Sequence, residues 1–67
     1  MTFYAWLKAQ AKRDDSVGDL AGDVLLDSNF PRQATLHETT HYLNGKLNFE
    51  AGRHAVIQAI KEYKATQ

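Results

Sequence analysis

The chain has no cysteine and only one proline, Pro31, among its 67 residues. Without cysteine, neither a disulfide nor a Cys-ligated zinc can support the fold. So short a chain also buries a small share of its surface. Stability must therefore come from packed apolar helix faces, and oligomerisation is a further source in chains of this size. We expect a single domain over residues 1–67.

Long apolar runs are also absent. No segment approaches the roughly 20 apolar residues that span a bilayer. Residues 1–10 lack the basic run and apolar stretch of a secretory signal. The hydrophobic content of 43% is ordinary for a globular domain and argues against disorder. We therefore expect a cytoplasmic protein with no membrane association.

Neither sign of charge dominates, because eight basic residues balance eight acidic ones. A neutral balance argues against a dominant electrostatic surface for nucleic acid. The charges are nevertheless segregated along the chain. Residues 1–13 carry three basic and no acidic residues, residues 14–27 carry five aspartates and no basic residue, and residues 28–67 carry five basic and three acidic residues.

Apolar residues recur at helical spacing in four segments, and no run alternates long enough to argue for a strand. We predict helices over residues 3–11, 17–27, 36–44 and 49–65, which makes the fold class all-α. The predicted buried stripes are Phe3, Trp6, Leu7 and Gln10; Val17, Leu20, Ala21 and Val24; Leu36, Thr39, Thr40 and Leu43; and Phe49, Gly52, Val56, Ala59, Ile60 and Tyr63.

Helix-capping residues mark the predicted ends. The predicted N-caps are Thr2, Ser16, Thr35 and Asn48. Glu38 completes a capping box with its N-cap, and Asp19 forms a similar pair in the second helix. Gly45 is well placed to end the third helix.

The only proline follows a break between the second and third predicted helices. Residues 27–31 read Asp-Ser-Asn-Phe-Pro. Pro31 pushes the residue before it toward an extended conformation. We therefore expect Phe30 to anchor this loop in the core.

Several short motifs occur in a characteristic order. They are Phe3-Tyr4-x-Trp6-Leu7, Asp14-Asp15, Leu20-Ala21, Asp27-x-x-Phe30-Pro31, His37-Glu38, Tyr42-Leu43 and Tyr63. This order resembles the YozE-like family of small bacterial proteins, whose fold is like the sterile alpha motif. The resemblance implies a compact four-helix domain. It implies no activity, because the family has no established biochemical function, and folds of this shape serve protein contacts and sometimes nucleic acids.

Residues 37–41 read His-Glu-Thr-Thr-His, the H-E-x-x-H pattern of zinc peptidases. In that pattern two histidines one turn apart share a zinc ion, and the glutamate acts as general base. A zinc hydrolase with His37 and His41 as ligands is therefore one alternative. Its third ligand would come from His54, Glu50 or Glu62.

Helix geometry argues against this zinc site. If Leu36, Thr40 and Leu43 face the core, both histidines lie on a solvated flank at ~100° per residue. The extended zinc-peptidase pattern also fails, because Asn44 and Leu47 occupy the positions of its glycine and third histidine. No cysteine, recognisable nucleophilic serine or Gly-rich phosphate loop is present. We expect no catalytic residue, no cofactor and no metal site.

Asp19, Asp23 and Asp27 recur every four residues along the second predicted helix, where like charges repel each other. We expect Leu26 to point outward near Asp19 and Asp23. An acidic ridge with an exposed leucine predicts a partner-binding patch.

A competing interpretation gives these residues structural roles. Asp27 would cap the following turn through its side chain, which we favour because turn-making is common for aspartate. Phe30 or Pro31 would then cover Leu26, and Asp19 and Asp23 would form a plain solvated face.

Sterile alpha motif domains can join head to tail, with the start of the last helix meeting an acidic mid-chain surface. By that resemblance, Lys46 and Arg53 of one copy would meet Asp19 and Asp23 of a neighbour.

Nucleic acid binding would need basic residues gathered on one surface. This happens if the terminal helices lie side by side and bring together Lys8, Lys12, Arg13, Lys61 and Lys64. Tyr4, Trp6 and Tyr63 suggest an aromatic binding surface, although core packing explains Trp6 and Tyr63 better.

We therefore expect a non-catalytic protein-interaction module that binds an unknown protein partner or itself. The residues predicted to carry it are Asp19, Asp23, Leu26, Lys46 and Arg53. A small DNA-binding protein is the first alternative, and the zinc hydrolase is the second.

Overall fold

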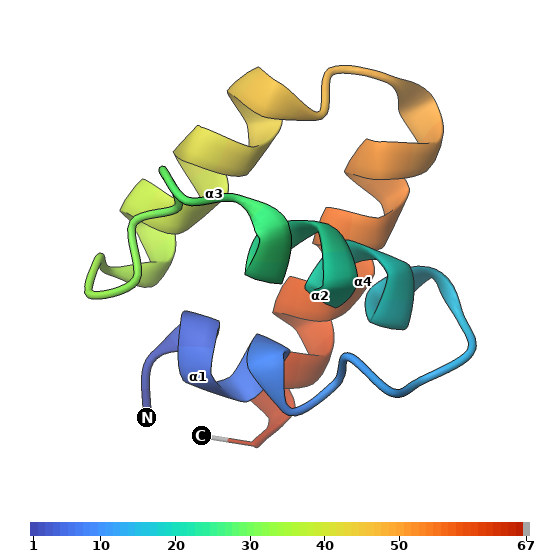
Figure 1. Cartoon of the computed structure of the whole chain (residues 1–67), viewed down its shortest axis with the longest axis horizontal. Coiled ribbons are helices and arrows are strands. Elements are labelled where there is room, and N and C mark those ends of the chain that lie inside the picture. The colour runs from blue at the N-terminus through green and yellow to red at the C-terminus, as the bar shows by residue number, and fades with distance from the viewer. Residues whose placement is uncertain (67) are drawn as a thin grey trace.

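The computed structural model describes residues 1–66. It contains four helices, α1 (Phe3–Lys8), α2 (Ser16–Leu26), α3 (Leu36–Lys46) and α4 (Glu50–Ala65). No strand occurs within these 66 residues, so the all-α prediction is confirmed. Figure 1 shows α2 lying across the longest helix, α4, with α1 beside the C-terminal part of α4.

The first helix is shorter than predicted. It ends at Lys8, and residues 9–12 continue as turns rather than as α-helix. The backbone N–H groups of Gln10 and Arg13 donate to carbonyls three residues earlier, which tightens the chain. This turn lets the chain reverse into α2.

The starts of two helices differ from the prediction. Asp15 caps α2 by accepting the Gly18 N–H at 3.0 Å, and Ser16 is already helical. Both residue types cap well, so sequence alone could not separate them. Helix α4 has Phe49 at its N-cap position with no side-chain cap bond, so the Asn48 prediction is wrong.

The predicted capping box of α3 is confirmed, because Thr35 and Glu38 each accept the other's backbone N–H. The predicted end of α3 at Gly45 is wrong. The helix runs to Lys46, and no glycine of the described chain adopts a positive φ. Nothing lies within 4 Å of where a Gly45 side chain would start. This glycine is an exposed helical residue.

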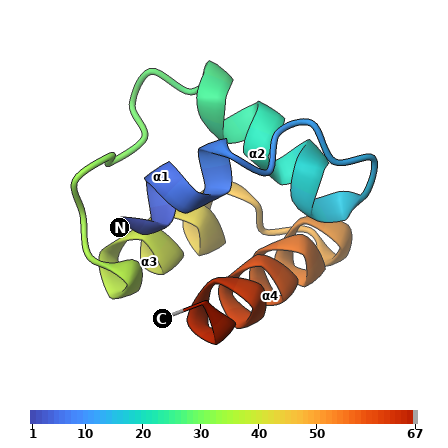
Figure 2. The ribbon, with the colours of Figure 1, turned by 90° about the horizontal axis from the view of Figure 1, so that it is seen from below.

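The core is aromatic where α1 meets α4. The Tyr63 ring meets the Phe3 ring edge-on at 5.3 Å between centroids and the Trp6 ring at 5.8 Å. The Tyr63 hydroxyl donates to the Met1 carbonyl at 2.6 Å. Figure 2 shows α1 near the middle of the view, between α3 and α2. Leu7 of this helix is fully buried.

The predicted stripes of α1 and α2 are buried apart from Gln10, which is half-exposed. In α3, Thr39 and Leu43 are buried while Leu36 and Thr40 are half-exposed. The α4 stripe is correct except at two positions. Ile60 is half-exposed, and Phe49 is 56% exposed instead of buried.

An ion-pair cluster fixes the α1–α2 connection to α4. Arg13 contacts Glu62 at 2.6 Å and Asp15 at 2.7 Å. These hydrogen bonds raise the pKa of Arg13. Gly18 also packs here, because a Cβ on it would lie 1.9 Å from the Arg13 carbonyl oxygen. The first turn of α2 therefore requires glycine at this position.

No helix among the described residues has the length and apolar character needed to cross a membrane.

Candidate functional site

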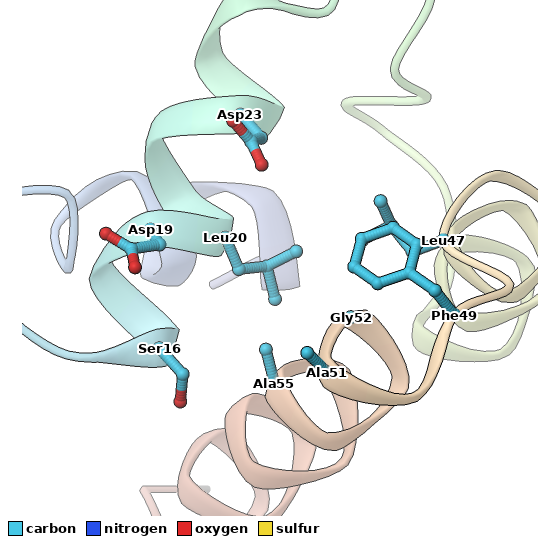
Figure 3. Close-up of a pocket in the computed structure, with 9 residues that line it drawn as sticks. All are labelled: Ser16, Asp19, Leu20, Asp23, Leu47, Phe49, Ala51, Gly52 and Ala55. Carbon is cyan, nitrogen blue, oxygen red and sulfur yellow. The ribbon is translucent and has the colours of Figure 1, made fainter.

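A hollow of about 200 Å³ lies between α2 and the first turns of α4. We call it the acidic groove, because α2 supplies two carboxylates to a mostly apolar lining. Its lining consists of Ser16, Asp19, Leu20, Asp23, Leu47, Phe49, Ala51, Gly52 and Ala55. Figure 3 shows α2 on one side of this hollow and the Phe49 ring with the start of α4 on the other.

Phe49 is held in an exposed position by the glycine beside it. A Cβ on Gly52 would lie 2.9 Å from the tip of the Phe49 ring and 3.0 Å from the Leu47 Cβ. The ring therefore packs on a helix surface that only glycine leaves open. It keeps 56% of its surface exposed. Figure 3 shows this ring above Gly52 and directed toward Leu20.

Asp19 and Asp23 carry the charge of the acidic groove. Both residues are exposed. Neither carboxylate takes part in an ion pair or a hydrogen bond within residues 1–66. Figure 3 places both on α2, with Asp23 leaning toward the hollow. Their negative charge is therefore available to a partner.

Asp27, the third aspartate of the series, is used within the fold. Its carboxylate accepts hydrogen bonds from the Tyr42 hydroxyl at 2.6 Å, from Lys46 Nζ at 2.7 Å and from the Asn29 N–H at 3.0 Å. The bonds from Lys46 and Tyr42 lower the pKa of Asp27 to about 2. In turn, the hydrogen bond to Asp27 raises the pKa values of Tyr42 and Lys46. This geometry agrees with the favoured turn-capping role of Asp27.

The α2–α3 connection turns Phe30 into the core, as predicted. Phe30 is 4% exposed and lies between the Tyr4 and Tyr42 rings, each 5.6 Å away between centroids. Because Phe30 turns inward, it does not cover Leu26, which is 87% exposed. The idea that Phe30 or Pro31 shields Leu26 is therefore wrong. Leu26 lines a shallow extension of the acidic groove with Asp23 and Leu47.

The two basic residues predicted to contact a neighbour have different surroundings. Lys46 is paired with Asp27 of its own chain at 2.7 Å. Its charge is thereby largely compensated. Arg53 is exposed and has no ion pair with any residue that the structure describes. Of the pair, Arg53 alone is left to meet an acidic partner.

His37 and His41 are exposed on α3, as the helical spacing predicts. No group of three or more His, Cys, Asp or Glu side chains gathers to hold a metal ion within residues 1–66. The motif's glutamate, Glu38, is used in the capping box, and those bonds lower its pKa. Glu62, a proposed third ligand, is bonded to Arg13. His54 is beside Glu50 and Ser16 at the other end of α4.

The basic residues considered for nucleic acid binding do not all carry a free charge. Arg13 pairs with Glu62 and contributes little free charge. Lys64 lines a shallow hollow with the α3 residues His37 and Thr40. Lys64 and Glu62 therefore face different neighbours. Arg13 therefore adds no free charge to the expected basic surface, which would consist of Lys8, Lys12, Arg13, Lys61 and Lys64.

An exposed stripe on α4 was missed by the sequence analysis. Arg53, Ile57, Lys61 and Lys64 follow one another at three- or four-residue spacing and are all exposed. Ile57 is 66% exposed. We call these four residues the basic stripe. The signal in the sequence was an isoleucine outside the apolar register of α4, with cations one turn away on either side.

A family model described as YozE SAM-like fold matches residues 2–65, which confirms the resemblance seen in the sequence motifs. No match was found among curated proteins or among solved structures.

Proposed function

This chain belongs to the YozE SAM-like fold family, and we propose that it is a non-catalytic protein-interaction module that binds its partner in the acidic groove. The partner element is an apolar side chain flanked by basic residues. The observation that carries this proposal is the exposed Phe49 ring in a hollow whose α2 side bears Asp19 and Asp23, two carboxylates with no partner in the described chain.

The apolar part of the groove supports a side-chain-sized occupant. A cavity of roughly 150 Å³ is large enough to bind benzene, and this hollow holds about 200 Å³. Burying an aliphatic side chain stabilises a complex by about 1.5–3 kcal/mol. A contact of this kind with basic neighbours favours a weak and specific complex.

The charges support a basic partner. Asp19 and Asp23 repel each other at four-residue spacing, and a cation placed between them relieves that repulsion. An acidic partner would add a third negative charge. Electrostatic complementarity of this type selects partners and speeds their association more than it adds affinity.

A peptide titration tests the proposal. Labelled protein is titrated with a helical peptide that carries a central leucine flanked by lysines, and amide chemical shifts are followed. We expect the largest shifts at Leu20, Leu47, Phe49 and Gly52. A peptide with glutamates in place of the lysines should bind at least tenfold more weakly. Absent shifts, or shifts centred away from the groove, would contradict the proposal.

Charge variants provide the matched control. Asp23→Lys should abolish the shifts, while Asp14→Lys makes the same charge change at an exposed aspartate outside the groove lining. Equal loss of binding in both variants would indicate that net charge, and not the groove, attracts the peptide.

Gly52→Ala tests whether the position of the Phe49 ring matters, without removing the ring. The added Cβ would force the ring to move, so peptide binding should fall while the fold is retained. Gly22→Ala is the control, because its Cβ would meet nothing within 4 Å. If Gly52→Ala binds as well as wild type, the position of Phe49 is irrelevant to recognition.

The alternative function, DNA binding, is tested by passing the protein over immobilised DNA at low salt, where contacts to phosphates are strongest. We expect no retention, because Arg13 is paired with Glu62 and the chain has no net positive charge.

A further inference from the structure

Two histidines on α3 have no role within the fold. His37 and His41 are both exposed, and neither imidazole takes part in a hydrogen bond or an ion pair within residues 1–66. Their spacing of four residues places one above the other on the same face of the helix. The third histidine, His54, lines a different hollow on α4 with Glu50. Helix α3 therefore presents two unused imidazoles side by side to solvent.

The helix holds this pair in a fixed register. The capping box of Thr35 and Glu38 fixes the first turn, which contains His37, and the helix continues beyond His41 to Lys46. Residues four apart in a helix have Cβ atoms about 5–6 Å apart. Both imidazoles can then reach one zinc ion at the usual Zn–N distance of about 2.0–2.1 Å. Such a pair binds more tightly than one imidazole, because the second ligand is already close when the first has bound.

The surroundings of the pair favour metal binding without catalysis. A zinc enzyme needs a third protein ligand, and no group of three or more His, Cys, Asp or Glu side chains gathers within residues 1–66. Glu38, which would be the general base of the motif, is bonded to Thr35. Two histidines one turn apart are nevertheless the part of the motif that holds the ion. Water would complete its coordination.

We propose that His37 and His41 form a binding site for a divalent late first-row metal ion such as Zn²⁺ or Cu²⁺. Imidazole nitrogen suits these ions, whereas Mg²⁺ prefers oxygen ligands. Cu²⁺ should bind more tightly than Zn²⁺, as the general order of divalent affinities predicts. The inference goes beyond the proposed function and does not depend on it, because neither histidine lines the acidic groove.

A titration of the untagged chain with ZnCl₂ tests the proposal. We expect about one ion per chain and a dissociation constant below about 1 mM. Affinity should be moderate, because only two protein ligands are present and the Lys64 cation lines a hollow with His37. The ring proton signals of His37 and His41 should shift, and those of His54 should not. MgCl₂ should cause no shifts. Absent binding, or shifts centred on His54, would overturn the inference.

Single substitutions separate the pair from the histidine content of the chain. His37→Ala and His41→Ala should each weaken Zn²⁺ binding at least tenfold, because one imidazole remains in each variant. His54→Ala is the matched control and should bind as wild type does. All three positions are exposed and helical, and circular dichroism checks that each variant folds. Equal affinities in all three variants would contradict the assignment.

Unfolding the chain gives the decisive comparison. In concentrated urea the helix no longer holds the two imidazoles together, so wild type should bind Zn²⁺ no better than the folded His37→Ala variant does. Zn²⁺ should also raise the unfolding temperature of wild type, since an ion that binds the folded state better stabilises it. The same affinity in the folded and unfolded chains would mean independent, adventitious binding by separate histidines, and the proposed site would not exist.

Discussion

The two connections that flank α3 each contain a phenylalanine, and they use it in opposite ways. Phe30, between α2 and α3, is 4% exposed, whereas Phe49, between α3 and α4, is 56% exposed. The ring of Phe30 lies between two tyrosine rings. The ring of Phe49 rests on a glycine and faces a hollow. The same residue type therefore closes the fold at one connection and leaves a surface open at the other.

The polar groups near the two rings show the same contrast: those near Phe30 have partners within the fold, and those near Phe49 do not. The α2–α3 connection is fixed by Asp27, whose carboxylate accepts three hydrogen bonds, and by the capping box that starts α3. The α3–α4 connection has no side-chain cap at the start of α4. The nearby Asp19 and Asp23 carboxylates have no partner in the described chain. Completed polar contacts indicate structure, and uncompleted ones indicate where another molecule can bind.

The largest expected difference between the two connections is the loss of stability when each phenylalanine ring is removed. Phe30→Ala should lower the free energy of unfolding by about 3–5 kcal/mol, because it leaves a cavity in the core. Phe49→Ala should cost less than about 1 kcal/mol, because most of that ring is already in water. Urea denaturation of both variants measures the two values. Equal losses would mean that Phe49 also holds the fold together.

Acid should weaken the α2–α3 connection selectively. The pKa of Asp27 is about 2 in the folded chain, below the value of about 3.9 for an unperturbed aspartate. A lowered folded-state pKa means that the stabilisation is complete above about pH 4 and is lost as the pH falls through about 2. Asp27→Asn should therefore be less stable than wild type near neutral pH.

The difference between Asp27→Asn and wild type should shrink toward about pH 2, because wild type loses the same contribution there. Urea midpoints measured across this range provide the test. Some acid sensitivity should persist in the variant, since hydrogen bonds also lower the pKa values of Asp15, Glu38 and Glu62. A difference that is constant with pH would contradict the assigned role of Asp27.

The smallest expected difference is between the stability losses at the N-terminal ends of α3 and α4. Thr35→Ala removes the hydroxyl that accepts the Glu38 N–H and should cost about 1 kcal/mol. Asn48→Ala should change stability by less than about 0.5 kcal/mol, since Asn48 is exposed and caps no helix. Thermal unfolding of the pair gives the comparison. A clear loss for Asn48→Ala would show a capping role that the static structure does not contain.

Much of the fold was predictable because local rules act on neighbouring residues. The i, i+3, i+4 apolar spacing located all four helices, and the Thr35–Glu38 capping box fixed where α3 begins. The predicted cap at Ser16 was wrong because the adjacent Asp15 is an equally suitable cap. The predicted cap at Asn48 was wrong because no side chain caps α4. The end of α3 failed because Gly45 is equally acceptable inside a helix and after one.

The candidate site was only partly predictable. The aspartate series on α2 pointed to Asp19 and Asp23, and the turn signal assigned Asp27 a separate role. Phe49 was placed in the core, because its apolar character agreed with the α4 stripe. Its exposure depends on the Gly52 surface and on the position of α2, neither of which spacing along the chain reveals.

The sequence by itself determined the helices, the family and the segregation of charge, because each depends on residues close together along the chain or on their order. Only the tertiary structure decided which charges are compensated: it pairs Lys46 with Asp27 and Arg13 with Glu62, while Asp19, Asp23 and Arg53 are left without partners among the described residues. It also decided which phenylalanine is buried. Pairing and burial depend on distances between residues far apart in the sequence, and those distances are set when the helices pack.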